Sequence, residues 1–267
     1  MKGKNLLKKT VLLTVALAMV VGVTACGQKK NYDSKDKKTY VVGTEPTFAP
    51  FDTTDADGNI VGFDMDLMKA IAKDQGFKVE FESLEFDALI PALKSDSTDI
   101  VIAGMNVTPE RAKQVAFSDP YYKTGIVVLV KKDNTTITGW DSFTSGSGLK
   151  VAAQTGTSQA DIAEQLKKEG KISKATILNQ NTTALQQLEN GDVDAVLVDK
   201  PVAVDIVASQ GAKYKVVGDM KTDSVADVAI AVKTDNKDLL KKINKGLKNI
   251  KENGTYDKLA KKWKIEQ

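Results

Sequence analysis

Arg111 is the only arginine in this chain of 267 residues, and every other basic side chain is a lysine. A guanidinium presents a planar set of donors that can bind both oxygens of a carboxylate, and an ammonium cannot reproduce that geometry. The residue follows a predicted buried strand at 99–103 and lies in the first turn of a helix predicted to begin at Thr108 and Pro109. Two interpretations follow: a clamp for a small carboxylate, or an isolated surface arginine in a lysine-rich protein.

Several other kinds of chemistry are disfavoured by composition and spacing. The chain has no histidine and a single cysteine, Cys26, so the commonest general base, the commonest metal ligand and intrachain disulfides are missing. The segment 53–64 loosely resembles a calcium loop, but Thr53 in the first position and Asp64 in the last favour a plain Asp-Gly hairpin. Gly156 is not part of a phosphate-binding loop, since no Gly-Lys-Ser/Thr follows it. We expect no catalytic residue, no metal and no cofactor.

The charge balance gives no support to nucleic-acid binding. The chain has 38 basic and 35 acidic residues, a formal charge of +3. Removing the four lysines of residues 1–25 leaves 34 basic residues and a net charge of −1. The lysines of the segment 233–264 are interpreted as the solvated face of C-terminal helices, with contact to anionic lipid as the alternative.

The N-terminal residues have the pattern of an export signal. Lysines precede the apolar stretch Val11–Val23, which is shorter than the ~20 residues that a membrane span needs. The stretch ends in Val23-Thr24-Ala25-Cys26-Gly27, which resembles a bacterial lipobox, whose cysteine is lipidated and becomes the first mature residue. Residues 26–38 are polar and are expected to form a flexible tether. We therefore expect a lipid-anchored protein on the extracytoplasmic face of a cell membrane, the outer surface of a Gram-positive bacterium.

From residue 39 onward, short apolar runs alternate with amphipathic segments, as in α/β folds. Strands are predicted at 40–43, 77–81, 99–103, 125–131, 150–153, 175–178, 195–198, 215–217 and 228–232, and helices at 64–75, 86–94, 159–168, 183–189, 202–209, 239–253 and 256–263. Single apolar strands flank the second α/β block. This pattern predicts a first lobe at 39–125, an inserted second lobe at 126–222, and a return crossover with the rest of the first lobe at 223–267.

From Tyr40 to Trp263 the chain resembles the extracellular solute-binding proteins of polar amino-acid ABC transporters, family 3 of the bacterial solute-binding proteins. The blocks that carry the resemblance are Gly43-Thr44-Glu45-Pro46-Thr47-Phe48-Ala49-Pro50-Phe51, Gly62-Phe63-Asp64-Met65-Asp66, Ile90-Pro91-Ala92-Leu93, Thr108-Pro109-Glu110-Arg111, Phe117-Ser118-Asp119-Pro120-Tyr121-Tyr122, Asp194-Ala195-Val196-Leu197-Val198-Asp199, Asn253-Gly254-Thr255-Tyr256 and Lys262-Trp263. The resemblance implies a type II periplasmic-binding-protein-like α/β fold, with two lobes and a hinge of two crossover strands. It also implies an L-amino-acid ligand, and a permease and its ATPase as partners of a monomer that is not an enzyme.

The resemblance further implies that Arg111 pairs with the ligand α-carboxylate and that Asp199 receives the α-ammonium. Charge-assisted hydrogen bonds would then replace the water that the ligand loses when the lobes close. The other binding residues that the resemblance implies are Glu45, Phe48, Phe86, Gly104, Asn106, Gln154, Thr157 and Ser158.

Simpler interpretations of some of these residues stay open. Phe48 and Phe86 would sandwich the ligand side chain or fill the core, and Ser158 would bind a carboxylate or cap its helix. Glu45 would face the variable end of the ligand or lie on a solvated rim. Asn106 departs from the Ser or Thr that is usual in the family. Val198 would add an apolar wall to the pocket or simply fill the core.

The sequence leaves the identity of the ligand open among glutamine, arginine, lysine and histidine, and Glu45 disfavours an acidic side chain. Two other functions compete with transport. The first is an enzyme on the same scaffold, similar to cyclohexadienyl dehydratase, with Glu45 as acid or base. The second is a sensor that uses the same amino acid as a signal.

Overall fold

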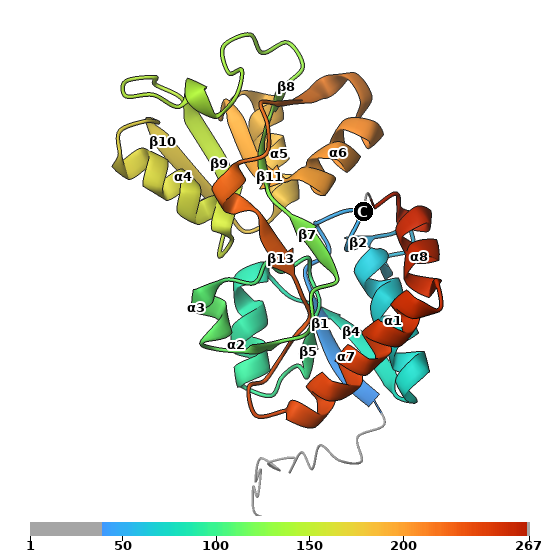
Figure 1. Cartoon of the computed structure of the whole chain (residues 1–267). Helices are drawn as coiled ribbons and strands as arrows, with labels where there is room; N and C mark the ends of the chain where they lie inside the picture. The colour runs from blue at the N-terminus through green and yellow to red at the C-terminus, as the bar shows by residue number, and fades with distance from the viewer. Residues whose placement is uncertain (1–38, 266–267) are drawn as a thin grey trace, which may run out of the picture. The chain divides into compact units, whose positions relative to one another are not determined.

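The computed structural model describes residues 39–265, which form two five-stranded sheets with helices on their faces and two short two-stranded sheets (Figure 1). The predicted signal peptide, the lipidation site at Cys26 and the tether lie outside the described residues. Within this described range, no helix combines the length and the apolar character that a bilayer span requires.

The first lobe is built on a five-stranded sheet with the order β4-β1-β5-β14-β6. Its strands are β1 (Thr39–Thr44), β4 (Lys78–Ser83), β5 (Ile100–Val101), β6 (Ala116–Phe117) and β14 (Ala231–Val232), and its helices are α1 (Phe63–Gln75), η1 (Phe86–Ala88), α2 (Leu89–Lys94), α3 (Pro109–Ala112), α7 (Lys237–Glu252) and α8 (Thr255–Trp263). Strand β1 is parallel to β4 and β5, whereas β14 is antiparallel to β5 and β6. Helices α1, α7 and α8 pack together beside the sheet, with α2 and α3 on the other side (Figure 1).

The packing of α1 on α7 follows from their apolar periodicity. Leu67 and Ile71 recur four residues apart on α1 and are fully buried, as is Ile243 on α7. Gly246 brings the two helices close, because an added Cβ would lie 2.8 Å from Cγ2 of Ile71. The long helix α7 can therefore cover the first lobe although it comes at the end of the chain.

The second lobe is built on a sheet with the order β10-β9-β11-β8-β12. Its elements are β8 (Ile126–Lys131), η2 (Trp140–Ser142), β9 (Lys150–Gln154), α4 (Ser158–Lys168), β10 (Lys174–Leu178), α5 (Asn181–Asn190), β11 (Ala195–Asp199), α6 (Lys200–Ser209), η3 (Gly211–Lys213), β12 (Tyr214–Val217) and η4 (Thr222–Ser224). Strands β10, β9 and β11 run parallel, and β8 is antiparallel to β11 and β12. The continuous apolar run of β8 is buried on both faces, as expected for a central strand between helices.

Two short antiparallel strands, β7 (Tyr122–Thr124) and β13 (Ala226–Val228), carry the chain between the lobes. The predicted single strand at 228–232 is divided in the structure into β13 and β14, separated by Ala229 and Ile230. The amide of Val107 donates to the carbonyl oxygen of Asp227 at 2.8 Å, so the hinge pairs directly with the loop before α3. The two-lobed α/β fold with two crossover strands is thus confirmed.

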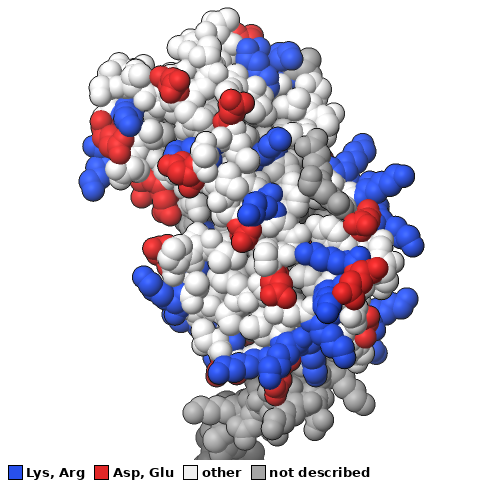
Figure 2. All heavy atoms as spheres, in the orientation of Figure 1, with Lys and Arg blue, Asp and Glu red and all other residues white. Residues whose placement is uncertain are grey.

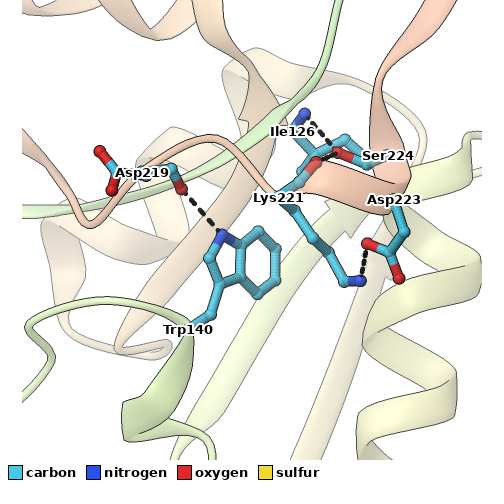
Figure 3. A network of polar contacts seen from close by, with 6 residues as sticks. All are labelled: Ile126, Trp140, Asp219, Lys221, Asp223 and Ser224. Atoms are coloured by element: carbon cyan, nitrogen blue, oxygen red, sulfur yellow. Dashed lines mark hydrogen bonds and ion pairs between the residues drawn. The ribbon is translucent and has the colours of Figure 1, made fainter.

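The return segment before β13 is fastened to the start of β8 (Figure 3). The hydroxyl of Ser224 accepts a hydrogen bond from the Ile126 amide at 2.9 Å and donates to the carbonyl oxygen of Lys221 at 2.7 Å. Trp140 Nε1 donates to the carbonyl oxygen of Asp219 at 3.1 Å, and the Lys221 ammonium lies 6.0 Å from the Trp140 ring centre. These contacts hold both crossovers at one point of the second lobe.

Two weaker sequence patterns are also located by the structure. Asp55 accepts hydrogen bonds from the amides of Asp57 and Asn59, and the flanking residues form the hairpin β2 (Thr53–Thr54) and β3 (Ile60–Val61). Lysines gather over α7 on the lower part of the face in Figure 2, and the exposed ones lie opposite the buried side chains of that helix. Both patterns match the plain hairpin and the solvated helix face.

Candidate ligand-binding site

A pocket lies where the two lobes meet. It is lined by Phe48, Phe86, Ala103, Gly104, Asn106, Arg111, Gln154, Thr157, Ser158, Gln159, Asn181, Leu197 and Asp199. Of the ten binding residues named from the sequence, only Glu45 is outside this lining, and its carboxylate lies beside Gln154.

Arg111 provides the positive charge of the pocket. It lies on the short helix α3, which begins because the Thr108 hydroxyl accepts a hydrogen bond from the Arg111 amide at 3.2 Å. Nη1 donates to the carbonyl oxygen of Asn106 at 2.7 Å, and Nη2 donates to that of Gly156 at 3.0 Å. The guanidinium lies 5.2 Å from the Phe86 ring centre. Burial lowers the pKa of Arg111, although the side chain stays cationic at any physiological pH.

Asp199 provides the negative charge and ends strand β11 in the second lobe. Its Oδ2 accepts a hydrogen bond from Gln159 Nε2 at 2.6 Å, whereas its buried Oδ1 has no partner among the described residues. Burial raises the pKa of Asp199 to about 7, against the opposing effects of Gln159, Asn106 and the charge of Arg111. A cation at Oδ1 would satisfy this oxygen and lower the pKa again.

A second unpartnered acceptor lies in the same pocket. Asn106 is 5% exposed, and its Oδ1 has no hydrogen-bond partner among residues 39–265. Orphaned buried acceptors are rare in folded proteins, because each one costs the free energy of its lost hydration. The Oδ1 atoms of Asn106 and Asp199 therefore indicate a missing donor in this part of the pocket.

The aromatic side chains form an apolar part of the pocket wall. The Phe48 ring stacks on Phe51 with centroids 5.8 Å apart, and it also borders the pocket. Gly104 has a φ of 55°, and an added Cβ would lie 2.4 Å from the Phe48 ring. Only glycine allows the loop to pass so close to this ring. Phe86 also lines the pocket and packs against Arg111, so both rings contribute to the packing and to the pocket wall.

The start of α4 is the part of the second lobe that faces Arg111. Thr157 caps this helix, since its hydroxyl accepts a hydrogen bond from the Ala160 amide at 3.2 Å. The prediction that Ser158 might cap the helix is wrong, because Ser158 is already the first helical residue. The first amides of a helix have no partners within it and favour an anion, so this end of the pocket suits a carboxylate.

The far end of the pocket combines amides with carboxylates. Gln154 Oε1 accepts a hydrogen bond from Asn181 Nδ2 at 2.8 Å, and Gln154 Nε2 donates to the Asn179 carbonyl oxygen at 3.0 Å. Glu45 is 2% exposed and accepts a hydrogen bond from the Thr47 hydroxyl at 2.7 Å. It is therefore not a solvated rim residue.

Glu45 has a raised pKa, mainly because of its burial and further because of the charge of Glu85, while hydrogen bonds from Gln154 and Thr47 oppose the shift. One oxygen of Glu85 is also buried without a partner in the described part of the chain. The two carboxyl groups thus lie close together, and neither forms an ion pair with a lysine or arginine among residues 39–265.

Several contacts join the lobes around the pocket. Besides the bond from Arg111 to Gly156, Gln180 Nε2 donates to Glu85 Oε1 at 3.3 Å. Gly156 has a φ of 74°, and an added Cβ would lie 2.9 Å from Cβ of Asp87 in the first lobe. The lobes are therefore in contact across the pocket, and the backbone of Gly156 lies close to Asp87 of the first lobe.

Sequence reasoning missed Gln159, Asn181, Ala103 and Leu197. The first two are polar residues at helix starts and give no signal that distinguishes them from solvated positions. Leu197 could have been found, because residues two apart on a strand share a face, and Asp199 had been named. Val198 points to the other face and lies in the core, so its interpretation as core filling is the correct one.

Comparison with known proteins places the chain in a family. The profile of the bacterial extracellular solute-binding proteins, family 3, matches residues 40–266. The arginine-binding extracellular protein ArtP of Bacillus subtilis (strain 168) is 36% identical over 258 residues, which cover 96% of this chain and 98% of ArtP.

Two similar solved structures are those of an ancestral arginine-binding protein. The arginine-bound structure has 44% identity and a TM-score of 0.79, covering 85% of this chain and 98% of the other. The glutamine-bound structure has 43% identity and the same TM-score, covering 86% and 99%. The chain is thus a member of family 3 of the bacterial extracellular solute-binding proteins.

Proposed function

We propose that this protein captures a free L-α-amino acid between its two lobes and delivers it to the permease of an ABC importer. The observation that carries the proposal is the pairing of Arg111 and Asp199, two opposite charges that line one buried pocket from different lobes. A zwitterion presents one group for each of them at a fixed separation. A ligand that bridges the lobes contacts only the closed state fully, and so stabilises closure.

The α-carboxylate is assigned to Arg111 and the start of α4. The guanidinium has five N–H donors, of which one on Nη1 and one on Nη2 bind backbone carbonyl oxygens. The remaining donors, the first amides of α4 and the Ser158 hydroxyl supply hydrogen bonds to an anion. Both backbone contacts hold the guanidinium in place before the ligand arrives, which reduces the entropy cost of binding.

The α-ammonium is assigned to the two orphaned acceptors. An ammonium has three donors and no acceptor, so it matches Oδ1 of Asp199 and Oδ1 of Asn106. Its charge would hold Asp199 in the ionised form despite burial. The Asn106 amide thereby takes the part that a hydroxyl plays in other members of the family.

The ligand side chain is assigned to the end of the pocket with Phe48, Phe86 and Glu45. Two neighbouring carboxyl groups without a cationic partner favour a side chain that carries a positive charge, and flat aromatic faces suit a guanidinium. Arginine is therefore the first candidate, in agreement with the names of the relatives. Lysine, histidine and glutamine follow, since Gln154 and Asn181 can bind an amide as well.

The same proposal includes attachment to the membrane through a lipidated Cys26, a permease with its ATPase as partners, and a monomeric state. The prediction for Cys26 can be tested separately by mass spectrometry of the mature N-terminus. Cys26→Ser should release the protein from the membrane fraction, and retention of the variant there would contradict the anchor.

A thermal-shift screen of the purified mature domain against all common free L-amino acids tests the proposal. A ligand at 100 times its Kd adds ~2.7 kcal/mol to the free energy of unfolding, which raises the Tm measurably. We expect a shift with a small basic or polar subset, and a much smaller shift for Arg111→Lys at the same concentrations. Absence of a shift with every amino acid would contradict the proposal.

One observation keeps an enzymatic alternative in view. The buried Glu45 carboxyl has a raised pKa, as a general acid or base often has. The relatives named above are binding proteins, which supports a non-catalytic role. Turnover of prephenate- or arogenate-like compounds, lost in Glu45→Gln, would favour the enzyme instead. A sensor would bind the same ligand but leave uptake of the labelled amino acid unchanged when the gene is deleted.

A further inference from the structure

Two carboxyl groups, Asp52 and Asp64, are fully buried behind the pocket without lining it. Asp64 Oδ2 accepts hydrogen bonds from the Gly104 amide at 2.8 Å and from the Tyr121 hydroxyl at 2.9 Å. Asp52 Oδ2 accepts one from the Thr44 hydroxyl at 2.9 Å. The Oδ1 atom of each carboxyl is buried and has no partner among the described residues. This pair plays no part in the ligand contacts assigned above.

The backbone brings the two carboxyl groups together. The Asp64 amide donates to the carbonyl oxygen of Phe51 at 2.9 Å, so the segment ending at Asp52 lies against the start of α1. Gly62 has a φ of 146°, and an added Cβ would lie 2.0 Å from the Phe51 carbonyl oxygen. The glycine is thus required for this approach, and with it for the proximity of Asp52 and Asp64.

No cation faces the pair among the described residues. The titratable groups around it are Glu45, which acts on Asp52, and Tyr121 and Tyr256, which lie on the side of Asp64. Burial raises the pKa of Asp52 well above its usual value, and the charges of Asp64 and Glu45 raise it further. Burial also raises the pKa of Asp64, to about 7, against its two hydrogen bonds.

Two close buried carboxylates without a cation do not both ionise at neutral pH, so one of them holds a proton. The charge belongs on Asp64, because this residue accepts two hydrogen bonds and lies in the first turn of α1, where the helix dipole favours an anion. The proton then belongs on Asp52.

We propose that Asp64 is a positioning residue that connects the ligand loop, residues 104–106, to the hinge through its hydrogen bonds. We propose further that Asp64 shares one proton with Asp52. The connection from Gly104 through Asp64 to Tyr121 is called the tie below. The loop side of the tie is Gly104, whose backbone leads through Asn106 toward Arg111. The hinge side is Tyr121, which directly precedes β7 and whose carbonyl oxygen accepts a hydrogen bond from the Tyr256 hydroxyl at 2.6 Å.

The shared proton keeps this tie in place over the neutral range. An ionised Asp64 accepts stronger hydrogen bonds than a neutral one, so the second protonation of the pair loosens both contacts. At high pH the pair loses its shared proton, which leaves two negative charges side by side in the core. The orientation of the ligand loop thus depends on a carboxyl pair that never touches the ligand. The effect of the carboxyl pair on ligand affinity rests on the proposed function, whereas the sharing of one proton does not.

The shared proton is tested by ¹³C NMR titration of protein labelled at the aspartate carboxyl carbons. We expect one carboxyl of the wild-type pair to remain protonated at pH 8, and that protonated signal to be absent from Asp52→Asn, whose remaining Asp64 has a pKa of about 7. Both proteins carry Asp199→Asn in this experiment, because this substitution removes the pocket aspartate that would titrate in the same pH range. Titration of every aspartate below pH 5 would overturn the shared proton, whether or not an amino acid binds.

The tie is tested by calorimetric affinities of Asp64→Asn and Asp64→Ala for the amino acid found in the thermal-shift screen. The asparagine keeps an acceptor oxygen for both donors and should bind within about threefold of the wild type, whereas the alanine should bind at least ~10-fold more weakly. Asp66→Ala is the control, since Asp66 lies on the same helix but binds Lys262 and Trp263 at the surface. Equal affinities of Asp64→Ala and Asp66→Ala would overturn the tie.

Tyr121→Phe decides the question if Asp64→Ala does not fold. This variant removes only the contact to the hinge and should weaken binding by about threefold, because one hydrogen bond to a charged acceptor is lost. Wild-type affinity of Tyr121→Phe would then overturn the proposal.

Discussion

The two halves of the pocket hold their charges in different ways. Arg111 in the first lobe is fixed by two backbone carbonyl oxygens and by a ring face, and its charge does not depend on pH. Asp199 in the second lobe is fixed through one oxygen only, and its other oxygen has no partner in the described structure. The cationic half is preorganised, whereas the anionic half is incomplete until a ligand arrives.

This difference places the pH sensitivity of the site in the second lobe. The pKa of Asp199 is about 7 without a ligand, and an ammonium at Oδ1 would lower it. Below pH 7 the ligand must therefore displace a proton from Asp199, whereas above pH 7 it need not. The first lobe contributes a rigid cation, and the second lobe contributes an anion whose ionisation depends on pH and on the ligand.

The largest expected effect comes from the preorganised half. Arg111→Lys keeps the positive charge but loses the planar set of guanidinium donors and the hydrogen bonds to the carbonyl oxygens of Asn106 and Gly156. We expect affinity for the amino acid to fall at least ~100-fold, since two charged hydrogen bonds are lost or weakened. Titration calorimetry measures the change, with Lys113→Arg as a surface control. A near-normal Kd would refute the clamp.

Asp199→Asn should weaken binding by roughly 30- to 100-fold and remove most of the pH dependence of the affinity. In the wild type we expect affinity to fall as the pH decreases below about 7 and to stay level above it. Calorimetry at a series of pH values separates the two proteins. A wild-type affinity that is constant from pH 5 to pH 8 would show that the ammonium is bound elsewhere.

The same substitution should change the pH dependence of folding without ligand. A carboxyl whose folded pKa is raised contributes stability that is present at low pH and is lost as the pH rises through that pKa. The wild type should therefore lose stability relative to Asp199→Asn as the pH rises through about 7. Urea denaturation at pH 5 and pH 8 measures the difference, which should grow with pH. A difference that stays the same at both values would contradict this account of Asp199.

Glu45→Gln tests the far end of the pocket with a smaller effect. We expect roughly 10-fold weaker binding of arginine and little change for glutamine, because one charge at the side-chain end is removed. Competition calorimetry with both amino acids gives the ratio. Equal losses for the two ligands would mean that Glu45 supports the fold and does not select the side chain.

Gly156→Ala should have the smallest effect and should act on closure alone. The residue has a φ of 74°, and the added Cβ would meet Asp87 of the opposite lobe. The strain of roughly 1 kcal/mol predicts a loss in affinity of about fivefold. Gly146→Ala is the matched control, since Gly146 also has a positive φ but no atom near its missing Cβ. Equal losses of affinity in both variants would show that the contact of Gly156 with Asp87 does not contribute to closure.

The long elements could be predicted from the sequence with their bounds, whereas the hinge could be predicted as two crossovers but not as the two strands that form it. Helix α1 and strand β8 each begin within one residue of the prediction, because α1 has an apolar periodicity over several turns and β8 is a continuous apolar run. Strands β7 and β13 have three residues each, which is too short for any period to be recognised. They exist because the two lobes on either side force the chain to cross twice.

The two opposite charges in the pocket could be named from residue type and family resemblance. The hydrogen-bond partners that hold these charges, and the buried carboxyl groups behind the pocket, could not. Nothing in the sequence distinguishes Gln159, which binds Asp199, from a solvated helix residue. The burial of Asp52 is equally hidden, since it depends on a chain segment brought against α1. Such positions are set by tertiary contacts between segments that no local pattern connects.

The most direct test of the two-charge pocket is one comparative calorimetric titration. The wild-type protein is titrated with its best amino acid and with the amine that lacks only the α-carboxylate, which for arginine is agmatine. We expect the amine to bind at least ~100-fold more weakly, because Arg111 and the start of α4 lose their anion. Equal affinities would contradict the assignment of the carboxylate to Arg111.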